Sequence, residues 1–132
     1  MYKKILHIGI AVKTLKEATK TFEKLGLAFE GNEEVPGEKV KVAFFKVGES
    51  RIELLEPTSP DSAIARFLDK RGEGVHHICI QTEDLKKRID ELKKRGFRFV
   101  TDEIKGAHGI KAAFLHPKNT NGVLFEIASA SY

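Results

Sequence analysis

The chain has 132 residues, 41% of them hydrophobic, which supports one domain core and excludes several large domains. Its formal net charge of +4 comes from scattered Lys and Arg residues, so we expect small anionic ligands as partners rather than nucleic acid. The single cysteine, Cys79, and the short apolar runs exclude an internal disulfide and a membrane-spanning helix, and we expect a cytoplasmic protein with no membrane partner.

The first part of the chain changes from alternating to helical periodicity and back, which predicts the order strand, helix, strand, strand, strand. The first strand is expected near 5–12. The helix is expected to begin after Thr14, which forms a capping-box signature with Glu17, and to end at Gly26. Three further strands are predicted at 27–34, 39–47 and 50–56.

Residues 57–74 form a linker that we expect to be packed rather than flexible. Two prolines break the chain at its start, and either Asp61 or Ser62 can cap a short helix that ends at Gly72. The apolar residues of this helix indicate that it packs across the junction between the two parts of the chain.

The second part of the chain repeats the first with a shift of 70 residues. Residues 6–29 align with 76–99, so that His7 lies over His77. Asp84 is the expected N-cap of the second helix, Gly96 its expected end, and strands are predicted at 97–104, 110–116 and 122–128. With three extra residues in the second copy, Glu53 aligns with Glu126. We therefore predict an α+β fold in one domain, 1–132, with module one at 4–56, a linker helix at 57–74 and module two at 75–130.

Both repeats place a histidine on the less apolar face of a strand. Because successive side chains of a strand point to opposite faces, Ile8 and Ile10 face the core while His7 shares the other face with small residues. His77 has the same position in the second copy, where Cys79 on the same face is expected to be a small packing residue. Taken alone, a strand histidine is more often a hydrogen-bonded core or surface residue than a metal ligand.

Glu53 and Glu126 both stand between apolar neighbours in predicted strands. A buried carboxylate costs several kcal/mol unless it is paired or bound to a metal, although an isolated strand glutamate is usually solvated at an edge. At matching positions in both copies, two imidazoles and two carboxylates predict one site for Co²⁺, Mn²⁺, Ni²⁺, Zn²⁺ or Fe²⁺. His7, Glu53, His77 and Glu126 are the predicted ligands.

Several sequence blocks resemble the vicinal oxygen chelate superfamily and, within it, the methylmalonyl-CoA epimerase family. The blocks are LHIGIAV at 6–12, IELLEP at 52–57, SPDSAIARFL at 59–68, GEGVHHICI at 72–80, AHGIKAAFLHPK at 107–118 and GVLFEI at 122–127. The resemblance implies a curved eight-stranded sheet of two βαβββ modules around a metal cavity, and it places the four predicted ligands on the metal positions of the family.

The resemblance also implies a reaction, in which the (R) and (S) epimers of methylmalonyl-CoA are interconverted with help from a divalent metal ion, Co²⁺ being the first choice. Glu126 would act as the catalytic base. The family can carry a second acid on its third strand, but residues 39–45 contain no carboxylate here, so Glu53 is the substitute that we expect. An acyl-CoA substrate and a homodimer follow from the same resemblance, and no further cofactor is expected.

Three other functions are compatible with the same fold. A glyoxalase I type lactoylglutathione lyase uses a comparable site, but the linker block argues against it. A ring-cleaving dioxygenase needs two histidines and one carboxylate, so a fourth ligand at Glu53 weighs against it. A non-catalytic small-molecule-binding member of the superfamily would not need all four ligand positions.

Overall fold

A computed structural model describes residues 2–101 and 103–129. Eight strands form one sheet in the order β2-β3-β4-β1-β5-β8-β7-β6, and this α+β fold of two βαβββ modules confirms the sequence prediction. The chain divides into two compact units, one of His7–His76 and one that joins the residues up to 6 with those from 77 onward. The module boundaries stay predictions, and the expected end of module two at residue 130 lies outside the described residues.

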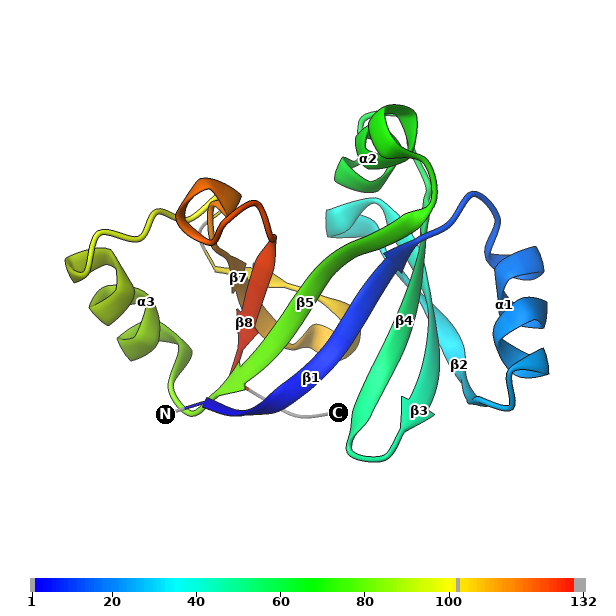
Figure 1. Cartoon of the computed structure of the whole chain (residues 1–132), viewed down its shortest axis with the longest axis horizontal. Coiled ribbons are helices and arrows are strands. Elements are labelled where there is room, and N and C mark those ends of the chain that lie inside the picture. Colours follow the sequence, from blue (N-terminus) through cyan, green and yellow to red (C-terminus); the bar gives the residue numbers. More distant parts are fainter. Residues whose placement is uncertain (1, 102, 130–132) are drawn as a thin grey trace. The chain divides into compact units, whose positions relative to one another are not determined.

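The unit of His7–His76 contains a four-stranded part of the sheet and the helix that covers it. Strand β1 (Tyr2–Ala11) runs parallel to β4 (Ser50–Pro57), β4 is antiparallel to β3 (Val40–Val47), and β3 is antiparallel to β2 (Ala28–Val35). Helix α1 (Leu15–Lys24) lies along these strands, as Figure 1 shows.

The core of this unit lies between α1 and one face of its strands. Phe45 is completely buried, and its ring contacts those of Phe22 and Phe29 with centroid distances of 6.0 and 5.5 Å. Ile10 and Val12 join this core, which confirms the face that the alternation in β1 predicts. The other members are Leu15, Ala18, Leu27, Ala43, Ile52 and Leu54.

The start of α1 differs from the sequence prediction. Thr14 is the N-cap residue, but its side chain accepts no capping hydrogen bond. Instead, the backbone N–H of Leu15 donates to Glu56 Oε1 at 2.6 Å, and that of Lys13 donates to Glu73 Oε2 at 2.8 Å. The capping box predicted at Thr14 is therefore wrong, and a carboxylate distant in sequence accepts the N–H of the first helical residue.

The linker contains helix α2 (Ala63–Arg71), and Ser62 rather than Asp61 caps it. The buried Ser62 hydroxyl accepts from the Ala65 N–H at 3.0 Å. Asp61 instead binds the Lys39 ammonium and the Ser59 hydroxyl, which lower its pKa to about 2. Because the Thr58 N–H also donates to the Lys39 carbonyl, the linker is fixed to the start of β3. Its packing across the junction stays a prediction.

The other unit repeats this organisation with shorter strands. It contains β5 (Gly74–Thr82) from His77 onward, α3 (Leu85–Lys94), β6 (Ile104–Lys105), β7 (Lys111–Phe114) and β8 (Phe125–Ala128). Asp84 caps α3 by accepting from the Lys87 N–H at 3.1 Å, which confirms the predicted start. The core under α3 consists of Leu85, Ile89, Leu92, Phe97, Phe99, Ala113, Leu115, Phe125 and Ile127.

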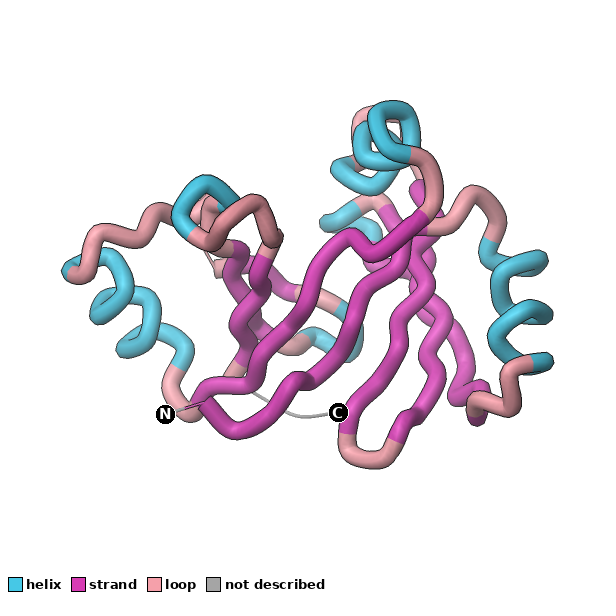
Figure 2. The backbone as a smooth tube through the Cα atoms, viewed as in Figure 1, coloured by secondary structure: helices cyan, strands magenta, loops and turns pink. Residues whose placement is uncertain are grey.

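The strand predicted at 97–104 is wrong over most of its length. Only a single bridge between Phe99 and Leu115 and the two residues of β6 pair there, and Asp102 lies outside the described residues. Figure 2 shows that loop makes up most of the segment between α3 and β7. One cause is a residue distant in sequence, because the Arg98 N–H donates to the Asn119 side chain instead of a strand.

Within residues 2–101 and 103–129, none of the helices is long and apolar enough to cross a membrane.

Candidate metal centre

His7 and Glu53 form a buried pair inside the unit of His7–His76. Their strands β1 and β4 are parallel, with Gly9 opposite Glu53 in the register. Because Gly9 has no side chain, the space beside the Glu53 carboxylate is open to the next residue on the same face, which is His7. His7 Nδ1 lies 3.2 Å from Glu53 Oε2.

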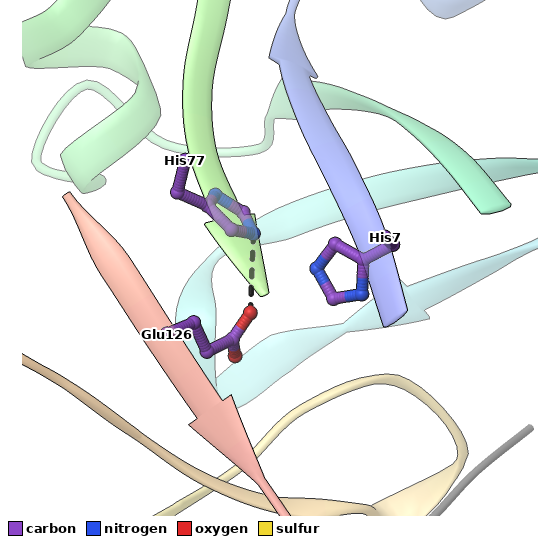
Figure 3. Close-up of side chains that lie close together, drawn as sticks. All are labelled: His7, His77 and Glu126. Atoms are coloured by element: carbon purple, nitrogen blue, oxygen red, sulfur yellow. Dashed lines mark ion pairs between the residues drawn. The ribbon is translucent and has the colours of Figure 1, made fainter. Parts of the chain in front are cut away.

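His77 and Glu126 form the corresponding pair inside the other unit. His77 from β5 and Glu126 from β8 point toward each other in Figure 3, and His77 Nε2 lies 3.1 Å from Glu126 Oε1. Here the residue opposite Glu126 is Cys79, which is small and packs with Ala112 and Ala128 as expected. The Phe114 ring contacts the His77 ring edge-to-face at a centroid distance of 5.3 Å.

The two pairs have the same local design. Each glutamate faces a small residue on one neighbouring strand and a phenylalanine on the other, Phe44 opposite Glu53 and Phe114 opposite Glu126. These phenylalanines are 70 residues apart, as are the two histidines. The repeat therefore extends to the residues that lie opposite the glutamates, which the sequence interpretation did not identify.

The donor atoms suit a divalent metal ion. His7, Glu53, His77 and Glu126 are each 7% exposed or less, and in each unit an imidazole nitrogen lies within 3.2 Å of a carboxylate oxygen. Buried imidazole and carboxylate groups are ligands that first-row transition metals accept, and a cation would balance the buried carboxylate charge. The residues therefore fit the metal that the sequence predicts.

Strand β3 contributes no carboxylate beside Glu53. Phe44 lies opposite Glu53 and Val42 opposite Leu55, and both side chains are buried. Lys46, opposite Arg51, also belongs to this face of β3, so the face carries no carboxylate next to the His7–Glu53 pair, as expected from residues 39–45.

Arg51 is a charged residue of the same face that the sequence interpretation missed. It is the register partner of His7 and stands two residues before Glu53 on β4. Its Nε donates to Glu30 Oε1 at 3.0 Å, and its guanidinium lies over the Phe44 ring, 5.2 Å from the centroid. The alternation of β4 carries the signal that could have identified it, because Arg51 and Glu53 have the same parity.

Comparison of the sequence with known proteins gives one family and several enzymes. Residues 6–114 match the Glyoxalase/Bleomycin resistance protein/Dioxygenase superfamily. The chain is 39% identical to the mitochondrial methylmalonyl-CoA epimerase of Homo sapiens, over 94% of this chain and 72% of that protein. It is also 39% identical to the ethylmalonyl-CoA/methylmalonyl-CoA epimerase of Cereibacter sphaeroides, over 96% of this chain and 98% of that protein.

Solved structures give the same result. A variant of Streptomyces coelicolor methylmalonyl-CoA epimerase in complex with 2-nitronate-propionyl-CoA matches with a TM-score of 0.95 and 34% identity, covering 100% of both chains. The methylmalonyl-CoA epimerase of Mycobacterium tuberculosis matches with a TM-score of 0.89 and 31% identity, over 94% of this chain and 85% of that one.

Proposed function

The chain belongs to the Glyoxalase/Bleomycin resistance protein/Dioxygenase superfamily, and within it we propose that this protein is a methylmalonyl-CoA epimerase that interconverts the (R) and (S) epimers of its substrate. Relatives with that name are 39% identical over 94% or more of the chain. The structural observation that carries the proposal is the buried His–Glu pair, which occurs at equivalent positions in both units.

The metal site of the proposal consists of His7, Glu53, His77 and Glu126. Strand β1 supports this set of ligands, because it carries residues of both units. Leu6 packs with Cys79 and Ala128, and the next residue in the chain is His7. A divalent ion held by these residues would act as a Lewis acid that favours loss of the proton next to the thioester carbonyl. Co²⁺ is the first choice, with Mn²⁺, Ni²⁺, Zn²⁺ and Fe²⁺ as alternatives.

The two glutamates are the proposed acid and base. Glu126 takes the α-proton from one epimer, the C–H electron pair moves toward the thioester oxygen, and a planar enolate results. Glu53, which starts in the protonated form, then donates its proton to the opposite face of the same carbon, so the inversion leaves Glu126 protonated and Glu53 ionised. Glu53 is assigned this role because the β3 residues on its face, Val42, Phe44 and Lys46, include no carboxylate.

An isotope experiment tests the acid and base roles. Each epimer is incubated in deuterium oxide with the wild-type protein, Glu126→Gln or Glu53→Gln, and both deuterium uptake and inversion are followed. We expect each variant to lose inversion, and Glu53→Gln to keep proton exchange in one epimer. The exposed glutamate of α1, Glu23, supplies the control, because Glu23→Gln should behave like the wild type. Inversion that persisted in Glu53→Gln would exclude Glu53 as the second acid.

Metal content and substrate identity are measured on the same samples. Elemental analysis of each variant separates loss of the ion from loss of proton transfer, since both glutamates are also proposed ligands. A parallel assay with the methylglyoxal–glutathione adduct tests the lyase alternative, and binding of small molecules to metal-free protein tests the non-catalytic one. Wild-type protein that carried metal and did not epimerise methylmalonyl-CoA would overturn the proposed function. Homodimer formation and a cytoplasmic location also stay predictions.

A further inference from the structure

The His7–Glu53 pair has a cationic neighbour on its own face of the sheet. Arg51 is the register partner of His7, and its Cα lies about 7 Å from that of Glu53, two residues along β4. An arginine side chain reaches that far, so a group bound at Glu53 lies within its range. Arg51 is therefore placed to contact a small ligand at the pair.

Two neighbours hold the Arg51 guanidinium in a defined orientation. Glu30 on β2 binds Nε at 3.0 Å, and the guanidinium carbon lies over the buried Phe44 ring, 5.2 Å from its centroid. Phe44 is also the register partner of Glu53, so the residue next to the Arg51 guanidinium is also the residue opposite Glu53. A guanidinium that is fixed in this way loses little further entropy when it binds an anion.

The internal repeat does not retain these two charges. At the positions equivalent to Arg51 and Glu30, the second copy has Leu124 and Val100. The residues around them are retained, because Phe44 corresponds to Phe114 and Glu53 to Glu126. A charge that occurs in one copy only is better explained by an asymmetric ligand than by the stability of a strand.

We propose that Arg51 binds the carboxylate of the malonyl-type acyl group and thereby selects carboxylated thioesters. This proposal rests on the proposed function, which supplies an acyl-CoA with a carboxylate on the carbon next to the thioester. The guanidinium has five N–H donors, so it can bind a carboxylate through a pair of hydrogen bonds while Glu30 holds Nε. Phosphates of the CoA are the other anionic groups of the same molecule, and the test separates the two.

The test compares the affinities of two CoA thioesters for the metal-loaded protein. Malonyl-CoA has the carboxylate, whereas propionyl-CoA lacks it and has the same phosphates. Isothermal titration calorimetry measures both dissociation constants for the wild type and for Arg51→Leu, the residue that the second copy carries. Arg51→Leu should weaken malonyl-CoA binding by about 10- to 100-fold and leave propionyl-CoA binding within about twofold, because a bidentate charge-assisted contact is lost.

Three further variants control for folding and for general charge. Glu30→Val combined with Arg51→Leu reproduces the second copy at both positions, and it should fold and show the same selective loss. Arg51→Lys keeps the charge without the planar fork and should give a smaller loss. Lys46→Gln removes a positive charge at the β3 position opposite Arg51 and should leave the ratio of the two affinities unchanged.

The outcomes distinguish this proposal from the proposed function. An equal loss of both thioesters in Arg51→Leu, or no loss of either, would overturn the role of Arg51, and an equal loss would indicate a CoA phosphate instead. Normal epimerisation by the wild type would leave the proposed function intact in either case. If the metal-loaded wild type bound neither thioester, both proposals would fail.

Discussion

Removal of the Glu56 carboxylate is expected to destabilise the protein at the start of α1. Glu56 Oε1 accepts the Leu15 N–H at 2.6 Å, whereas the Thr14 hydroxyl makes no capping hydrogen bond. The carboxylate also lies at the positive end of the helix dipole. Glu56→Ala should therefore lower the free energy of unfolding, and Thr14→Ala should leave it nearly unchanged.

The size of the effect follows from the type of contact. A hydrogen bond to a charged group contributes about 1.5–3 kcal/mol, and loss of an N-cap acceptor costs about 0.5–2 kcal/mol. Because Glu56 is only half-buried, we expect about 1.5 kcal/mol for Glu56→Ala. An unfolding entropy of about 2.1 cal/mol/K per residue gives about 0.28 kcal/mol/K for 132 residues, so Tm should fall by about 5 °C.

Calorimetry and urea unfolding measure these differences. Glu56→Gln is the intermediate variant, because it keeps an acceptor oxygen but loses the charge, and about half of the loss is expected. Thr14→Ala should change the stability by less than about 0.5 kcal/mol, the range of a surface substitution without a special contact. A loss in Thr14→Ala as large as that in Glu56→Ala would show that the hydroxyl caps the helix in solution and would refute the reasoning.

Three other predictions concern the linker and the core. Ser62→Ala should cost about 1–2 kcal/mol in urea unfolding, because a buried hydroxyl that caps α2 is lost; an unchanged midpoint would contradict it. Lys39→Gln should raise the pKa of Asp61 from about 2 toward 3.8, as NMR titration of its carboxyl carbon can measure. The pKa of Asp61 is depressed in the fold, so its stabilisation is present above pH 3.8 and is lost as the pH falls through about 2. Phe45→Ala should cost about 3–5 kcal/mol in the same unfolding assay, because a fully buried ring with two aromatic neighbours is removed, and a loss below about 1 kcal/mol would be inconsistent with the core.

The elements of this fold could be predicted because periodicity and repetition can be read directly from the order of the residues. The 70-residue repeat placed β1 over β5, and alternation in these strands assigned Ile10 to the core and His7 to the opposite face, as observed. Parity also predicted that Glu53 and His7 would share one face, although their pairing depends on β1 lying beside β4. Both His–Glu contacts follow from this parity together with parallel pairing.

Features that depend on distant residues were not predicted. The capping box at Thr14 was wrong because a local pattern cannot show that Glu56 comes close to the Leu15 N–H. The strand at 97–104 was wrong for a similar reason, since the Asn119 side chain takes the Arg98 N–H. In both cases a side chain more than twenty residues away accepts a backbone hydrogen bond that the local pattern does not show.

The repeat also separates residues that the fold requires from residues that a ligand requires. Leu15 and Leu85 occupy the same place in the two cores, as do Ala43 and Ala113, because the same helix must cover the same strands in each copy. An acyl-CoA has no such symmetry, so a duplicated scaffold that binds it has to differ where the two copies meet different parts of the ligand. Arg51 differs from Leu124 at a position where the surrounding residues are retained, and a single substitution between copies therefore tests a functional difference with the fold held constant.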